Sequence, residues 1–168
     1  MITDVWAELR TVFGVHLADI YPGIQVTGLN RALQELIVRH MLKSVHDIEP
    51  MLEDANSGAG LYPQTIDSIV WCLLSDQVDG MIWMETEIDK LVLPQLGLFL
   101  PDDVSLSIHY IMGMWSPVTL IGLFELLRWI NDLDSRIHIA MEKDTAPTIL
   151  LEQFNETWQS YLSDGGRV

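Results

Sequence analysis

Apolar residues recur every three to four positions through most of the chain, a spacing that is typical of amphipathic helices. The first such segment, Asp4 to Tyr21, ends at Pro22-Gly23. A second begins after Asn30, a residue type that caps helices well. Further helices are predicted at residues 63–79, 81–93, 104–115, 117–142 and 147–162. Most of the chain is therefore expected to be helical.

Strand signals are weak by comparison. Strict alternation of apolar and polar residues does not persist beyond a few positions, and Val104–Ile108 (Val, Ser, Leu, Ser, Ile) is the best strand candidate. Asn56–Gly60 is the clearest loop, and no repeat recurs at a solenoid period. The pattern predicts an all-α fold, a single compact domain of six to eight helices over residues 1–163, with a flexible C-terminal tail at 164–168.

One stretch is long enough to be considered for a membrane span. Residues 104–124 contain no Asp, Glu, Lys or Arg, but Ser116-Pro117 reads as the cap and first residue of a new helix. We therefore expect two buried core helices here instead of a span. The N-terminus has no basic stretch followed by an apolar one, so no secretory signal is visible. Together these features predict a cytoplasmic protein with no membrane role.

Charge is distributed unevenly along the chain. The sequence has 24 Asp and Glu against 9 Lys and Arg, a net charge of −15. Residues 44–127 hold thirteen acids and one base, so this segment alone has a net charge of −12. Such a balance excludes direct binding to nucleic acid, which needs a basic face, and disfavours anionic lipid. Two interpretations remain: a solubilising surface, or an acidic face that docks a basic protein.

No constellation of residues indicates a reaction. The single cysteine, Cys72, excludes an intramolecular disulfide and any multi-cysteine metal site, and no His-x-x-x-His pair is present. Acid pairs such as Asp76 and Asp79 are typical of a solvated surface. His109, in the uncharged stretch, is expected to be a core or pocket histidine. We predict no metal, no cofactor and no catalytic residue, and the sequence favours a protein that is not an enzyme.

The six tryptophans include one in an unusual setting. Trp83 stands in the run Met-Ile-Trp-Met and is followed by three acids. Aromatic and methionine anchors rimmed by acids are typical of an interface for a basic, partly apolar partner, although a core position fits the same pattern. The predicted partner-binding residues are Trp83, Glu85, Glu87, Asp89, Asp102 and Asp103.

These features favour an acidic protein-binding module. We expect it to neutralise a basic protein partner, such as a nuclease-like toxin, by occluding its active or nucleic-acid-binding cleft. Immunity proteins, antitoxins and phage inhibitors, of bacterial or phage origin, are the general kind. One alternative is a helical small-molecule-binding protein or enzyme, with a pocket lined by Trp71, Trp115, His109 and Tyr110. Another is an oligomeric structural or assembly adaptor that uses residues 104–130 as its interface. The sequence leaves the oligomeric state open.

Overall fold

Antiparallel strands, and not helices alone, make up the centre of this protein. A computed structural model of the chain describes residues 4–15, 17 and 20–165. In these residues the chain forms five helices and eight strands, and all eight strands belong to one sheet. The predicted all-α fold of six to eight helices is therefore wrong. The protein has a mixed α/β fold.

The sheet has a short strand at each of its two edges. Its strand order is β3-β2-β4-β6-β7-β1-β8, with β5 paired to β4 outside this path, and every pairing is antiparallel. The strands are β1 (Gly23–Thr27), β2 (Val45–Asp54), β3 (Gly60–Leu61), β4 (Val78–Ile88), β5 (Leu91–Val92), β6 (Leu96–Phe99), β7 (Ser105–Tyr110) and β8 (His138–Met141).

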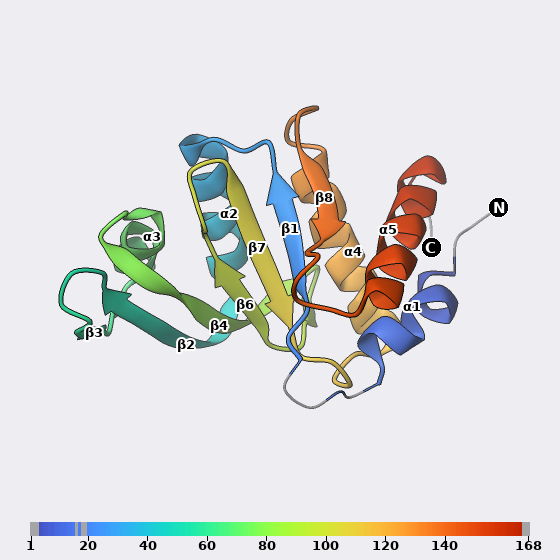
Figure 1. Ribbon diagram of the computed structural model, residues 1–168, viewed down its shortest axis with the longest axis horizontal. Helices are drawn as coiled ribbons and strands as arrows, with labels where there is room; N and C mark the ends of the chain where they lie inside the picture. Colours follow the sequence, from blue (N-terminus) through green and yellow to red (C-terminus); the bar gives the residue numbers. More distant parts are fainter. Residues whose placement is uncertain (1–3, 16, 18–19, 166–168) are drawn as a thin grey trace.

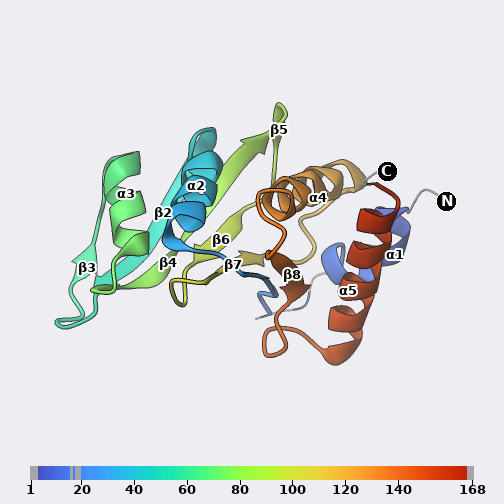
Figure 2. The same ribbon diagram turned by 90° about the horizontal axis from the view of Figure 1, so that it is seen from above.

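The helices are gathered on one side and at one end of the sheet. Helices α2, α3 and α4 lie along one face, while α1 and α5 pack against each other at the β8 end (Figure 1, Figure 2). The opposite face of β2, β4, β6 and β7 has none of the described helices over it. The helices are α1 (Val5–Phe13), α2 (Arg31–Leu42), α3 (Ile66–Leu74), α4 (Pro117–Asn131) and α5 (Thr148–Ser163).

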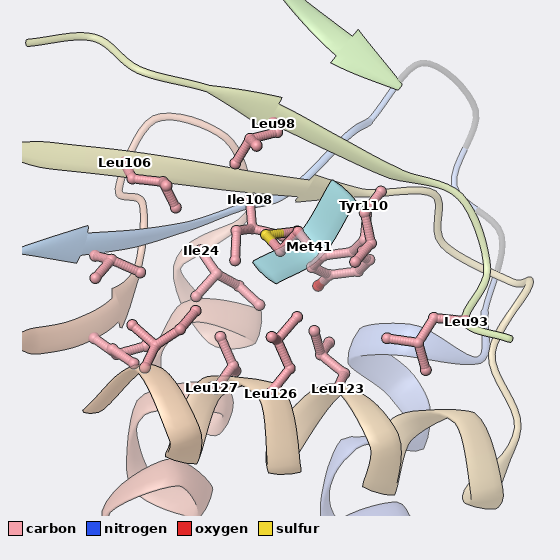
Figure 3. Packing of buried hydrophobic residues seen from close by; sticks show 14 of the residues in the cluster. Ile24, Met41, Leu93, Leu98, Leu106, Ile108, Tyr110, Leu123, Leu126 and Leu127 are labelled. Atoms are coloured by element: carbon pink, nitrogen blue, oxygen red, sulfur yellow. The ribbon is translucent and has the colours of Figure 1, made fainter. Parts of the chain in front are cut away.

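The core lies between the sheet and the helices. Because side chains alternate along a strand, one set of residues from each central strand faces α2 and α4. Figure 3 shows Ile24 of β1 and Ile108 of β7 directed toward Leu126 and Leu127 of α4, and all four side chains are buried. Met41 of α2 enters the same cluster. The other set of strand residues is left on the open face.

Several predicted helices begin where expected, and their caps explain why. The helix predicted at residues 117–142 nevertheless ends at Asn131, and strand β8 (His138–Met141) occupies the end of that range. Asn30 accepts a hydrogen bond from the amide of Leu33 at the start of α2, and Ser116 caps α4 with Pro117 in its first turn. The first predicted helix ends early, because Gly14 closes α1. Residues 16, 18 and 19 of that prediction, and 166–168 of the predicted tail, lie outside the described residues.

Two predicted helices are strands instead. Residues 81–93 belong mainly to β4 and β5, and residues 104–115 contain β7, which confirms the strand candidate there. Residues 81–84 show no alternation of apolar and polar residues, because all four are apolar. Met81 and Trp83 lie on the open face, whereas Ile82 and Met84 enter the core. Helix-favouring Met and Glu in this segment added to the error, and pairing within the sheet overrode their local preference.

The uncharged stretch at residues 104–124 is divided between β7 and the first turns of α4, so it is not the pair of core helices that the sequence predicted. None of the helices in the described part of the chain combines the length and the apolar content that crossing a membrane requires.

Candidate functional site

A cleft of about 920 Å³ lies on the open face of the sheet. Its floor is formed by side chains from three strands: Met51 of β2, Trp83 of β4 and His109 of β7. Its walls come from residues 20–21, just before β1, and from residues 144–147, just after β8. Strands therefore supply a rigid floor, and two connecting segments from distant parts of the sequence close the sides.

The register of the sheet aligns five residues in one row across this floor. Glu49, Trp83, Gly97, His109 and Gly23 are successive cross-strand partners on β2, β4, β6, β7 and β1. A β-carbon at Gly97 would lie 3.1–3.2 Å from three ring atoms of Trp83. Nearly equal distances to three neighbouring ring atoms mean that the indole lies face-on over the glycine. Gly97 thus leaves room for the indole of Trp83, and Gly23 leaves room for the imidazole of His109.

Ser107, His109 and Glu142 form a hydrogen-bonded cluster at one end of the row. The Ser107 hydroxyl donates to Glu142 and lies 3.2 Å from Nε2 of His109. Nδ1 of His109 lies 3.1 Å from the carbonyl oxygen of Tyr21. A catalytic triad would place a carboxylate on that imidazole nitrogen, and Ser107 is 0% exposed, so its hydroxyl is not open to a substrate. The cluster ties the two walls of the cleft to β7.

Carboxylates on the open face oppose one another across β2 and β4. Asp47 is the direct partner of Glu85, and Glu53 is the direct partner of Asp79. Between these two pairs lie the Glu49–Trp83 and Met51–Met81 partners. We call these four cross-strand pairs the acidic ladder. Its centre is apolar and carries one further carboxylate, and each of its ends carries two like charges side by side.

The acids of the ladder have no counter-ion among the residues that the structure describes. None of its five carboxylates, nor Asp144 on the cleft wall, forms an ion pair with a residue in the described part of the chain. Four arginines pair with other acids: Arg31 with Asp76, Arg39 with Glu35 and Asp67, Arg128 with Asp132, and Arg136 with Asp134. Within the described part of the chain, the carboxylates of the acidic ladder are therefore left without an ion pair.

Four of the predicted partner-binding residues follow one another along β4 and its turn. Trp83 and Glu85 are both members of the acidic ladder. Glu87 lies further along the strand, with its carboxylate 2.8 Å from Nε2 of His46. Asp89 lies in the turn between β4 and β5, with a positive φ of 49°. Trp83 and Glu85 therefore lie together on the open face, whereas Asp89 lies beyond the end of β4.

The other two predicted residues lie at the opposite ends of the strands, beside the start of β4. Asp102 and Asp103 belong to the turn between β6 and β7. Asp102 accepts hydrogen bonds from the Ser105 hydroxyl, at 2.7 Å, and from the amide of Val104, at 2.9 Å. The bond from Ser105 lowers the pKa of the Asp102 carboxyl below its ordinary value of 3.8. The six predicted residues therefore do not form one cluster.

Sequence reasoning missed Tyr21, Glu49, Met51 and Asp144. A signal for β2 was present, because the acids at positions 47, 49 and 53 are separated by even numbers of residues, as one face of a strand requires. Pro50 obscured it, since a proline within such a run is a poor strand residue. No local signal could place Tyr21 or Asp144, because both reach the cleft from connecting segments.

The alternative pocket lined by Trp71, Trp115, His109 and Tyr110 does not form. Tyr110 and Trp115 are buried in the core, where each contacts the ring of Phe13. Trp71 is 61% exposed on α3, and His109 lies on the opposite face of β7 from Tyr110. His109 does line a pocket, as expected, but its aromatic neighbours in the cleft are Tyr21 and Trp83.

Metal-ligating and thiol groups add nothing to this site. Among the described residues, no three His, Cys, Asp or Glu side chains come together in a way that could hold a metal ion. Cys72 is buried in α3, and its burial raises the pKa of the thiol. A raised pKa keeps the thiol protonated and unreactive.

Comparison with known proteins gives little further information. No family model and no curated protein matches the sequence. The fold has a weak likeness to a chain in the crystal structure of the toxic C-terminal tip of CdiA from Pseudomonas aeruginosa in complex with immune protein. The TM-score is 0.41 and the identity 13%, over 76% of this chain and 90% of that chain. A likeness at this level supports no conclusion about function.

Proposed function

We propose that the protein is an acidic protein-binding module that captures a basic protein on the open face of its sheet. The opposed carboxylates of the acidic ladder carry the proposal. Like charges at directly opposed positions destabilise a sheet, so the Asp47–Glu85 and Glu53–Asp79 pairs work against folding. Solubility needs surface charge but does not need it in opposed pairs. A partner with lysine and arginine side chains would relieve this repulsion on binding.

The apolar centre of the ladder supports the same function. Met51, Met81 and Trp83 lie between the two acidic ends, and Met51 is 59% exposed. Aromatic and methionine side chains at the centre of a polar rim supply most of the affinity of many interfaces. The surrounding charges then raise the association rate and select a partner of opposite sign.

The expected mechanism is occlusion. An enzyme that acts on nucleic acid needs a basic cleft to neutralise phosphates, and that cleft is the surface an acidic face complements. By covering it, the module would neutralise a nuclease-like partner in the manner of an immunity protein, an antitoxin or a phage inhibitor. The partner's own active site need not be contacted for this, because blocking the phosphate path is sufficient.

Retention of a basic protein by matched variants tests the proposal. Wild type, Trp83→Ala and Glu49→Lys are immobilised and incubated with a lysate of the organism that encodes the protein. Trp71→Ala and Glu156→Lys are the controls, because both residues are exposed on helices away from the cleft. Bound proteins are eluted with rising salt, which screens exposed charges, and identified by mass spectrometry.

We expect a basic protein that wild type and both controls retain until high salt, and that both cleft variants lose. Equal retention by the cleft variants would contradict binding at this face. So would a bound protein that is acidic, because like charges across an interface repel.

The size of the cleft favours a small-molecule-binding protein as a second candidate. Its volume of about 920 Å³ falls within the range of about 300–1,000 Å³ that is usual for ligand sites. Gln95, Glu49 and Asp144 supply polar groups among the apolar lining. Native mass spectrometry of the purified protein distinguishes this candidate, because a retained ligand adds its mass to the 19.1 kDa chain.

A further inference from the structure

One face of the Trp83 indole covers Gly97 on the sheet, so its other face is turned away from the strands. The ring of Tyr21 contacts the indole edge-to-face, with centroids 5.7 Å apart and an angle of 64° between the planes. Tyr21 is 50% exposed, so both rings meet the space of the cleft. Aromatic rings arranged at an angle around an open space offer their negative faces to a cation.

Carboxylates flank these rings on two sides. Glu49 is the direct cross-strand partner of Trp83, and Asp144 lies on the opposite wall. Neither forms an ion pair with a described residue, and the described lining includes no lysine or arginine. Both ring nitrogens of His109 are engaged by Ser107 and the Tyr21 carbonyl. The described lining of the cleft thus combines aromatic faces with negative charge and contains no lysine or arginine.

We propose that the cleft receives an arginine side chain of the basic partner, with its guanidinium stacked on Trp83 and hydrogen-bonded to Glu49. A planar guanidinium can stack on an indole while its N–H groups bind a carboxylate at its edge. An ammonium group is a more strongly hydrated point charge and gains less from this geometry. Met51 and Met81 supply apolar surface for the methylene stem.

The arginine comes from a protein and not from a free metabolite, and this part of the inference rests on the proposed function. The acidic ladder continues past the cleft to Glu53 and Asp79 at one end and to Asp47 and Glu85 at the other. A small guanidinium compound held on Trp83 leaves these four carboxylates uncompensated. A basic surface that carries the arginine on a loop can oppose all of them at once.

Peptides that differ in a single group test the assignment. The probe is acetyl-Gly-Arg-Gly-amide, with the lysine peptide and the neutral citrulline peptide as comparisons. Each is titrated into the full-length ¹⁵N-labelled protein, and the indole N–H signal of Trp83 is followed by NMR. Its assignment comes from the signal that disappears in Trp83→Phe. The amide of Gly97, beneath the indole, is a second reporter.

We expect the arginine peptide to shift both signals saturably, the lysine peptide to bind more weakly and the citrulline peptide to leave them unchanged. Glu49→Gln should weaken arginine binding about two- to fivefold, the range for one exposed ion pair. Glu156→Gln, which removes a charge on α5, should leave the affinity unchanged. A Trp83 signal that does not respond, or that responds equally to citrulline, would overturn the assignment.

The two proposals fail separately. If the cleft variants lose a basic protein partner while the arginine peptide leaves Trp83 unchanged, the arginine inference is wrong and the proposed function stands. If the arginine peptide binds but the full chain retains no basic protein, the proposed function is contradicted. In that case the protein source of the guanidinium is overturned with it.

Discussion

The indole of Trp83 lies face-on over Gly97, its direct partner across the β4–β6 ladder. A glycine inside a strand weakens the strand because it has no side chain to pack. Here the neighbouring indole covers the exposed backbone, as aromatic residues do for glycines in other sheets. The same contact fixes the orientation of the ring that the cleft presents. The contact between Trp83 and Gly97 therefore bears on both the stability of the sheet and the proposed binding of a partner.

Gly97→Ala should damage binding more than folding. The added β-carbon lies too close to the indole, but the ring is the end of a side chain and can move aside. We expect the free energy of unfolding to change by less than about 1 kcal/mol, while partner retention falls measurably but less than in Trp83→Ala. Urea unfolding and the retention assay measure the two effects. In a Trp83→Ala background the same substitution should have no further effect on binding, and a clear additional loss there would contradict the model of a displaced ring.

Glu53→Lys should stabilise the protein and slow its association with a basic partner. It converts the like-charged Glu53–Asp79 pair into an opposite-charged pair, which should contribute about 0.5 kcal/mol to the free energy of unfolding. The same change removes negative charge from the open face and reduces electrostatic steering. Thermal unfolding and stopped-flow association rates report the two effects. Glu156→Lys alters the net charge equally, so a matching gain in its stability would show that overall repulsion, and not the opposed pair, is responsible.

Asp102→Asn should make a pH-dependent difference to stability. Hydrogen bonds from Ser105 and Val104 hold the pKa of Asp102 below its ordinary value of 3.8 in the folded protein. A carboxyl with a lowered pKa adds stability that is complete above its unfolded pKa and is lost as the pH falls through its folded pKa. We therefore expect the variant to be less stable than wild type near neutral pH, with a difference that shrinks as the pH falls below about 4.

Urea unfolding at a series of pH values measures this difference, with Asp103→Asn as the neighbouring control. A deficit of constant size from neutral to acidic pH would indicate a loss of packing or turn geometry and would contradict the electrostatic explanation.

The helices could be predicted from the sequence because their signals are local. Asn30 and Ser116 mark the starts of α2 and α4 by their own hydrogen bonds to the next turn. Apart from β7, the strands could not be predicted; β4, for example, packs one face on the core and lines a cleft with the other, which leaves an apolar run without alternation. Pairing between distant segments, such as β2 with β4, then decides the fold.

The sequence brought candidate residues together only where they are neighbours along the chain. Trp83 and Glu85 were proposed together because an aromatic anchor and an acid stand two residues apart, and the register places both on one face of β4. Glu49 joins them through cross-strand register, which depends on long-range pairing. Asp89 and Asp102 were included because their charge is visible in the sequence, whereas their turn positions are not.

Ser107→Ala should reveal whether the Ser107–His109–Glu142 cluster is structural. The hydroxyl is buried and contacts both neighbours, so its removal leaves two polar groups without a partner, at a cost of about 1–2 kcal/mol in the free energy of unfolding. Ser163→Ala, at the exposed end of α5, is the control and should cost less than about 0.5 kcal/mol. A structural hydroxyl that is closed to solvent should also resist a fluorophosphonate, which labels nucleophilic serines. Covalent labelling of Ser107 in the native protein, located by peptide mass spectrometry, would instead indicate a reachable nucleophile and favour an enzyme.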